Sequence, residues 1–138
     1  MSTTEKIVRR CYRAYADKDR AAIETLVAPD FRFTSPLDDS IHRETYFARC
    51  WPNNERQKRR DVVRLLVDGP DAFVTHECET IEGKRFGNTE LFQTRDGQAV
   101  SVEVYFGWDI PHDGKAQRSR TSPWPWRAPT ERSTCSGT

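Results

Sequence analysis

The sequence predicts a single α+β domain in which three helices precede a mostly antiparallel sheet. Two observations support this prediction. Apolar residues recur at helical spacing in the first 51 residues, and beyond residue 62 they recur at the spacing of extended strands. The chain has 138 residues, the length of one domain, and 31% of them are charged. A helical half followed by a half rich in strands is typical of an α+β fold.

Two helices are expected before the first strand. Apolar side chains over residues 7–16 recur at i, i+1, i+4 and i+5, which describes one stripe of a helix. Thr3 or Thr4 is its expected cap. A second apolar stripe covers residues 22–27, and Pro29 is expected to end that helix because proline cannot continue the hydrogen-bonded ladder.

A short strand and a third helix are expected next. The alternation from Phe31 to Ser35 predicts the strand. Asp39 or Ser40 is the expected cap of a helix from Arg43 to Trp51, which Pro52 would break.

The second half of the sequence predicts a four-stranded meander. Each connection contains glycine with Asp, Glu, Lys or Pro beside it, which is typical of hairpin turns. The four expected strands are Val62 to Asp68, Phe73 to Ile81, Arg85 to Thr94 and Ala99 to Trp108.

The end of the chain differs in composition from the rest. Residues 111–138 carry a net charge of +3 and contain no Leu, Ile, Val, Phe, Met or Tyr, whereas residues 1–110 carry −2. Such a segment buries too little apolar area to offset its ordering entropy. We therefore expect the domain to span residues 1–110 and a disordered tail to follow.

The overall charge excludes some classes of partner. Lys and Arg total 22 against 21 Asp and Glu, so no strong field favours nucleic acid or an anionic membrane. The first ten residues contain no apolar stretch of signal-peptide length. We expect a cytoplasmic protein with free cysteine thiols, without a nucleic-acid or membrane partner.

Several short motifs, in their order, resemble those of the nuclear transport factor 2-like superfamily, and within it the SnoaL-like and ketosteroid isomerase-like proteins. The resemblance covers about residues 3–110. It implies a cone-shaped α+β barrel, in which a curved sheet wraps round the helices and leaves a pocket at its open end. Members include isomerases, epoxide hydrolases, polyketide cyclases and non-catalytic binding modules. The motifs are Ile7-Val8-Arg9-Arg10-Cys11-Tyr12, Asp19-Arg20-Ala21-Ala22-Ile23, Ala28-Pro29-Asp30-Phe31, Asn88-Thr89-Glu90-Leu91-Phe92 and Val102-Glu103-Val104-Tyr105-Phe106-Gly107.

The resemblance also assigns positions to the isomerase machinery. The base aspartate of those enzymes corresponds to Ser35, their first-helix tyrosine to Cys11, and their protonated acid to Glu90. Ser35 and Cys11 cannot perform those roles, so the resemblance does not imply ketosteroid isomerisation. Glu90 keeps a carboxyl group at the third position.

Strand alternation groups the acidic residues. In the strand that begins at residue 73, Thr75, Glu77 and Glu79 share a face that the resemblance places on the concave side. A shift of one residue in register would instead point His76 and Cys78 inwards. With the first register, His76 is expected on the outer surface of the sheet.

The next strand adds a third glutamate to the expected pocket. Asn88, Glu90 and Phe92 share its inward face. Three carboxylates at low dielectric cannot all ionise, so a shared proton and a raised pKa would suit acid/base catalysis. The alternative is that two of these acids are solvated or paired with Arg or Lys. The candidate catalytic residues are Glu90, Glu77, Glu79 and Asn88.

Aromatic side chains and a polar mouth complete the expected pocket. Tyr46 and Trp51 recur at helical spacing, and Asp38 either orients a ligand or belongs to the helix cap. His76-x-Cys78 is half of a metal site with no second pair, so we expect neither metal nor cofactor. The candidate ligand-binding residues are Phe33, Ser35, Asp38, Tyr46, Trp51, Thr75, Phe92, Phe106 and Trp108.

Two functions remain open on the sequence. One is an isomerase, cyclase or hydrolase that acts on a small, largely apolar molecule through its carboxylates. The other is a non-catalytic ligand-binding or dimerisation module. We expect a homodimer, because Val74, Cys78, Leu91 and Tyr105 would leave the convex face partly apolar.

Overall fold

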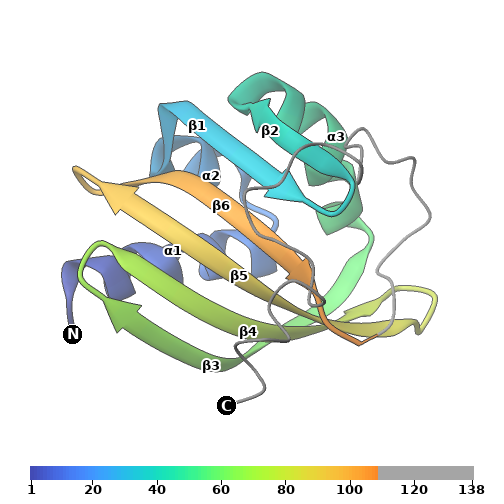
Figure 1. Cartoon of the computed structure of the whole chain (residues 1–138). Helices are drawn as coiled ribbons and strands as arrows, with labels where there is room; N and C mark the ends of the chain where they lie inside the picture. The colour runs from blue at the N-terminus through green and yellow to red at the C-terminus, as the bar shows by residue number, and fades with distance from the viewer. Residues whose placement is uncertain (109–138) are drawn as a thin grey trace, which may run out of the picture.

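The protein folds as three helices packed against one face of a curved six-stranded sheet (Figure 1). The structure is a computed structural model that describes residues 1–108. The elements are α1 (Thr3–Ala16), α2 (Arg20–Leu26), β1 (Val27–Ser35), β2 (Asp38–His42), α3 (Arg43–Glu55), β3 (Gln57–Asp68), β4 (Asp71–Thr80), β5 (Arg85–Arg95) and β6 (Gln98–Phe106). The predicted α+β class is therefore confirmed.

The sheet has the order β2-β1-β6-β5-β4-β3 and curves without closing, so β2 and β3 are its edges. β1 and β6 run parallel, whereas each other neighbouring pair is antiparallel. The predicted meander is present as β3 to β6. Its last turn has positive φ angles at both central residues, Asp96 (52°) and Gly97 (80°), as a type I′ hairpin requires.

The segment between β1 and α3 differs from the sequence prediction. Residues 38–42 form strand β2, and Asp39 and Ser40 do not cap the helix. The cap position is His42, whose side chain makes no capping hydrogen bond. Pairing with β1 places Ile41 opposite Phe33, and both side chains are buried. Burial and ladder hydrogen bonds therefore outweigh the local capping preference.

Two helix ends also differ from the expectation. Ser2 rather than Thr3 or Thr4 caps α1, because its hydroxyl accepts from the backbone N–H of Glu5. α3 continues through Pro52 to Glu55. The lost backbone hydrogen bond falls in its last turns, where it interrupts little of the helix.

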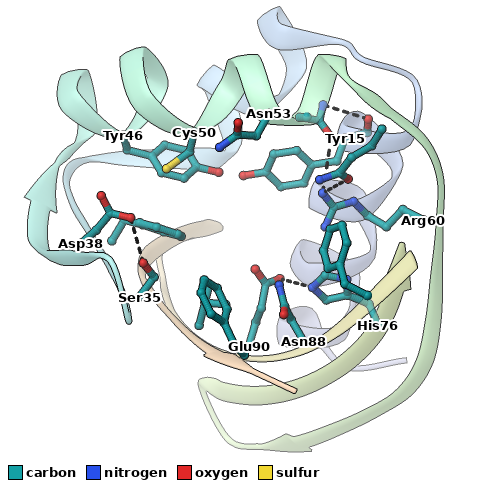
Figure 2. Close-up of a pocket in the computed structure, with 16 residues that line it drawn as sticks. Tyr15, Ser35, Asp38, Tyr46, Cys50, Asn53, Arg60, His76, Asn88 and Glu90 are labelled. Carbon is teal, nitrogen blue, oxygen red and sulfur yellow. Dashed lines mark hydrogen bonds and ion pairs between the residues drawn. The ribbon is translucent and has the colours of Figure 1, made fainter. Parts of the chain in front are cut away.

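The helices divide the concave face between them. α1 contacts β3, β4, β5 and β6, whereas α3 contacts β1 and β2. The two helices leave a cavity at one end of the sheet (Figure 2). This is the open end that the resemblance implies.

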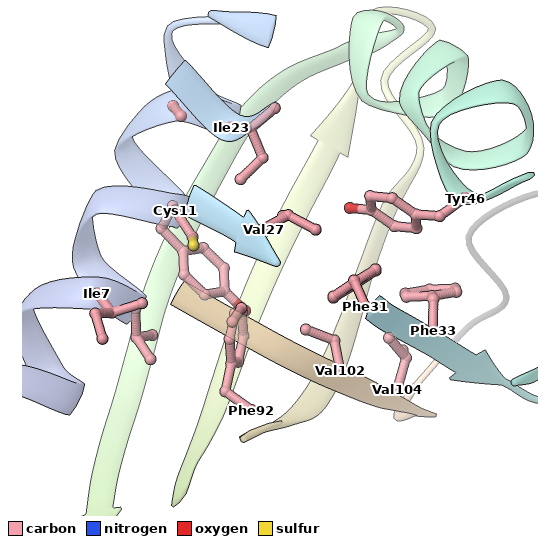
Figure 3. Close-up of a cluster of buried hydrophobic side chains, with 14 of the residues drawn as sticks. Ile7, Cys11, Ile23, Val27, Phe31, Phe33, Tyr46, Phe92, Val102 and Val104 are labelled. Carbon is pink, nitrogen blue, oxygen red and sulfur yellow. The ribbon is translucent and has the colours of Figure 1, made fainter. Parts of the chain in front are cut away.

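The hydrophobic core fills the rest of the space between helices and sheet (Figure 3). Ile7 and Cys11 on α1 lie with Phe92 on β5, and Phe31 on β1 packs edge-on against the ring of Tyr46 on α3. Each of these side chains is buried. This close-packed core fixes the positions of the helices and strands that line the pocket.

Cys11, Cys50 and Cys78 are free thiols. No helix within residues 1–108 is long and apolar enough to cross a membrane. The predicted tail, residues 111–138, lies outside the described residues.

Candidate functional site

The cavity at the open end has a volume of about 100 Å³ and lies between α1, α3 and the concave face of the sheet. Apolar and aromatic side chains form its walls, and polar groups come from opposite sides. The walls are Tyr15, Phe33, Tyr46, Phe86, Val104 and Phe106. The polar lining is Ser35, Asp38, Cys50, Asn53, Asn54, Gln57, Arg60, His76, Asn88 and Glu90.

Glu90 is the central acid of the pocket. Its side chain is 14% exposed and points into the cavity from β5 (Figure 2). The hydroxyl of Tyr12, 78 positions earlier on α1, donates a hydrogen bond to its Oε1 atom. Burial, followed by the charge of Glu90, raises the pKa of Tyr12 well above its usual value. Tyr12 therefore stays a hydrogen-bond donor and holds the carboxylate in place.

His76 and Cys78 lie on the inner face of β4, and His76 is next to Glu90 of β5. The Nε2 atom of His76 is 3.6 Å from Oε1 of Glu90, and its Nδ1 atom is 3.3 Å from the Sγ atom of Cys78. Burial lowers the pKa of His76 to about 4, although the charge of Glu90 opposes this effect. His76 is therefore neutral at neutral pH.

Arg60 provides a cation at the same end of the pocket. Its guanidinium lies 5.8 Å from the ring centre of Tyr12 and 5.1 Å from that of Tyr15. It donates hydrogen bonds to the side-chain oxygens of Gln57 and Asn54. Burial alone would lower the pKa of Arg60, but nearby acidic groups, including Glu90, raise it overall. Arg60 therefore remains charged.

Three buried polar atoms at this end of the pocket have no hydrogen-bond partner within residues 1–108. They are His76 Nε2, Asn88 Oδ1 and Arg60 Nε. Each of these residues lines the cavity. Unpaired buried polar atoms are costly, so their convergence on one cavity is typical of a site that binds a polar group.

The opposite wall carries a second, fully paired carboxylate. The hydroxyl of Ser35 donates to Oδ2 of Asp38 over 2.8 Å, and Nε of Arg49 donates to Oδ1 over 2.7 Å. Asp38 and Ser35 are both buried. Figure 2 shows this pair across the cavity from Glu90 and Asn88. Asp38 is thus paired with Ser35 and Arg49 and does not cap a helix.

Seven of the thirteen candidate residues line the pocket, and six do not. Those that line it come from β1, β2, α3, β5 and β6, so the structure brings together segments far apart in sequence. They are Phe33, Ser35, Asp38, Tyr46, Asn88, Glu90 and Phe106.

The expected acidic cluster is wrong, because β4 has the opposite register. Val74, His76 and Cys78 are buried on the concave side, whereas Glu77 and Glu79 point to the convex side. Thr75 shares that outer face with its β5 neighbour and lies 3.0 Å from Thr89, hydroxyl to hydroxyl. His76 is therefore not on the sheet surface.

Three aromatic candidates lie outside the pocket lining. Trp51 is buried beside Tyr15, with 5.8 Å between ring centres, and Phe92 is buried beside Tyr12, at 5.9 Å. Trp108 is half-exposed, and its indole covers Gly87 so closely that a Cβ atom there would clash. Trp51 thus packs against Tyr15 of the pocket wall, and Phe92 packs against Tyr12, which binds Glu90.

Sequence reasoning missed Tyr12, Tyr15 and Arg60. The tyrosine position was assigned to Cys11, which is a core residue, whereas Tyr12 one position later reaches Glu90. Tyr15 follows at i+3, so the two hydroxyls on one helix face were the available signal. Arg60 has no comparable signal, because its basic run resembles an ordinary solvated strand entry.

Taken together, these groups can move a proton on a bound molecule. Glu90 supplies a carboxylate held by a donor, neutral His76 lies 3.6 Å from it, and cationic Arg60 lines the same cavity. A base positioned next to groups that stabilise negative charge is the arrangement that proton abstraction needs.

Solved structures of similar fold include an NTF2-like protein of unknown function from Cytophaga hutchinsonii. It is 21% identical, with a TM-score of 0.65, over 78% of this chain and 92% of that one. No curated protein matches the chain.

Two further solved structures have names that describe an activity. An LEH-like epoxide hydrolase of M. tuberculosis is 16% identical, with a TM-score of 0.62, over 76% of this chain and 83% of that one. A protein described as a putative polyketide cyclase from Sinorhizobium meliloti is 20% identical, with a TM-score of 0.61, over 75% and 99%. At these identities the likeness shows the fold alone. The family model of the SnoaL-like domain matches residues 8–119, so the chain belongs to the SnoaL-like domain family, within the NTF2-like superfamily.

Proposed function

We propose that this chain binds a small, largely apolar molecule in the pocket and that Glu90 transfers a proton on it, in a reaction of the isomerase, cyclase or hydrolase type. Aromatic walls with few polar groups suit a compact, mostly apolar ligand. The names of the epoxide hydrolase and the polyketide cyclase of similar fold support an enzymatic role.

The observation that carries the proposal is how the two carboxylate oxygens of Glu90 are hydrogen-bonded. Tyr12 binds its Oε1 atom, while no residue of 1–108 donates a hydrogen bond to Oε2. Oε2 can therefore accept a proton from a ligand in the cavity. In that step a C–H or O–H bond of the ligand breaks, its electron pair stays on the ligand, and the proton moves to Oε2.

A non-catalytic binding module is the second candidate, and one observation favours it. Glu77 and Glu79 lie on the other face of the sheet, so no second unpaired carboxylate within residues 1–108 lines the pocket to share a proton with Glu90. Asp38 is already bound by Ser35 and Arg49. Glu90 would then only orient a ligand.

Hydrogen exchange of a ketone separates these two functions. Acetophenone in deuterated buffer loses the proton NMR signal of its methyl group when a base removes those protons. We expect the wild-type protein to accelerate this loss over buffer and Glu90→Gln to lower the enzymatic rate by about 100-fold or more. Glu77→Gln, on the convex face, is the matched control and should exchange as the wild type does.

The binding module gives a different result. Saturation-transfer NMR would then detect acetophenone bound to the wild type and to Glu90→Gln, with no exchange above the buffer rate in either. That outcome would remove the catalytic proposal and leave the binding function.

A further inference from the structure

We propose that Cys78 fixes His76 as the neutral tautomer with its proton on Nε2, and that this N–H binds an acceptor oxygen of the ligand beside Glu90. The inference rests on the proposed function, because it concerns the same pocket. It adds a positioning residue, Cys78, and a requirement on the ligand, an oxygen that accepts a hydrogen bond.

The first step is the protonation state of His76. Its side chain is 1% exposed, and burial lowers its pKa to about 4. Glu90 favours the charged ring, but burial, with the charge of Arg60, outweighs this. At neutral pH the ring therefore has a single proton to place on one of two nitrogens.

The second step is the choice of nitrogen. Nε2 of His76 faces Oε1 of Glu90 at 3.6 Å. A proton on Nδ1 would leave the Nε2 lone pair opposed to a carboxylate oxygen, which is repulsive. A proton on Nε2 turns the same contact into an attraction, so the electrostatics of the pocket favour the Nε2–H tautomer.

The third step is the partner of Nδ1. Cys78 follows His76 by two positions on the same inward face of β4, and its Sγ atom is 3.3 Å from Nδ1. Burial raises the pKa of the Cys78 thiol to about 11, although Arg60 opposes this. The thiol keeps its proton and can donate it to the Nδ1 lone pair, which only the Nε2–H tautomer presents.

The fourth step is what the Nε2–H group binds. The separation of 3.6 Å from Glu90 is too long for a hydrogen bond, and Nε2 is one of the three orphaned polar atoms of the pocket. A ligand oxygen placed in the cavity would satisfy it. Carbonyl and hydroxyl oxygens both accept, so the proposed ligand carries one of them on an apolar frame.

Nitrogen NMR of the full chain tests the tautomer directly. The protein is labelled with ¹⁵N-histidine, and His76→Gln identifies the signals of His76. Between pH 5.5 and 8 we expect a pyrrole-like Nε2 and a pyridine-like Nδ1. Cys78→Ala should raise the Nδ1–H fraction about fivefold, the factor that corresponds to about 1 kcal/mol, whereas Cys78→Ser should restore the wild-type pattern.

Cys11→Ala is the control, because Cys11 is equally buried but is not paired with His76. A pyridine-like Nε2 in the wild type, or a Cys78→Ala variant with unchanged populations, would overturn the inference.

A matched pair of ligands tests the acceptor oxygen. Acetophenone and α-methylstyrene have the same shape, but a methylene group replaces the carbonyl oxygen in the second. We expect only acetophenone to shift the Nε2 resonances of His76. Equal shifts, or no shift with acetophenone, would overturn this part. The two assays can fail separately. If Glu90→Gln loses exchange but Nε2 of His76 is pyridine-like, only this inference is wrong. If Nε2 is pyrrole-like but the wild type does not accelerate exchange, only the proposed function is wrong.

Discussion

Among single residues, Glu90 matters most for both the site and the stability of the fold, because its hydrogen bond with Tyr12 connects β5 to α1. Tyr12 donates to its carboxylate, and both side chains lie away from bulk water. The sequence correctly predicts that Glu90 points inwards, but it wrongly predicts Glu77 and Glu79 as the neighbours of this acid. Its actual neighbours are Tyr12 and the neutral His76, and Arg60 lines the same cavity.

The contact with Tyr12 predicts different effects of two substitutions at Glu90. Glu90→Gln keeps an oxygen that accepts from Tyr12, so the free energy of unfolding should stay within about 1 kcal/mol of the wild type. Glu90→Ala leaves the buried hydroxyl without its acceptor and should cost about 1–3 kcal/mol. Urea unfolding followed by circular dichroism measures both.

A second variant isolates the cause of that loss. Adding Tyr12→Phe to Glu90→Ala removes the orphaned hydroxyl and should recover part of the stability. If the double variant is less stable by the full sum of both changes, the hydroxyl is not the reason.

His76 predicts how stability depends on pH. Its pKa is about 4 in the folded state, against 6.5 for an ordinary histidine. Above pH 6.5 the ring is neutral in both states, so it does not affect stability. As the pH falls from 6.5 towards 4, only the unfolded chain gains the proton, and stability falls by a total of about 3 kcal/mol.

Urea unfolding at pH 7, 5.5 and 4.5 checks this dependence. His76→Gln, which has no ring to protonate, should show a shallower decline over the same range. Parallel declines in the two proteins would mean that other groups cause the loss of stability.

At the scale of secondary structure elements, one lysine connects the end of α1 to the end of α3 and the start of β3. Lys18 has a φ of 55°, which turns the chain after α1. Its ammonium donates to the carbonyl oxygens of Asn54, Glu55 and Gln57 over 2.8, 3.1 and 2.6 Å. A cation at the C-terminus of a helix also interacts favourably with the helix dipole.

Lys18→Met should lower the free energy of unfolding by about 1 kcal/mol, a modest value because the side chain is exposed. The exposed Lys58 on β3 provides the control, and Lys58→Met should have no effect beyond a few tenths of a kcal/mol. Amide hydrogen exchange should show faster opening over residues 52–57 in Lys18→Met alone. Equal protection in both variants would contradict this role.

For the whole molecule, the convex face of the sheet is the surface that we expect to form a homodimer. The residues expected there are only partly correct, because Val74 and Cys78 point into the core. Leu66, Phe73 and Leu91 are instead direct neighbours across β3, β4 and β5. Leu66 is 61% and Phe73 48% exposed. A row of apolar side chains on one sheet face suits a symmetric contact with a second copy.

Multi-angle light scattering at high micromolar concentration should therefore report twice the mass of one chain. Phe73→Lys should give a single chain, because it places a charge in the middle of the row. Ile81→Lys alters an even more exposed apolar residue just beyond the end of β4 and should remain dimeric. A monomeric wild type would exclude the dimer.

The sequence by itself determined the class of fold, the meander and the inward face of β5. Helices and strands have different periods of apolar residues, and hairpin turns are marked by glycine. Both signals are read from residues close together in sequence, so these features can be predicted without the tertiary structure. The set of Asn88, Glu90 and Phe92 follows from the same alternation. The family motifs are likewise spread along the chain in a recognisable order.

Only the tertiary structure decided the register of β4 and the contact between Tyr12 and Glu90. Both faces of β4 carry apolar residues, such as Phe73 on one and Val74 on the other, so alternation alone could not orient the strand. In the folded protein, the face of β4 that packs in the core under α1 is the one with Ala72 and Val74, which are smaller than Phe73 and fully buried. The bond between Tyr12 and Glu90 joins residues 78 positions apart, a proximity that the packing of α1 on the sheet creates and no local pattern encodes.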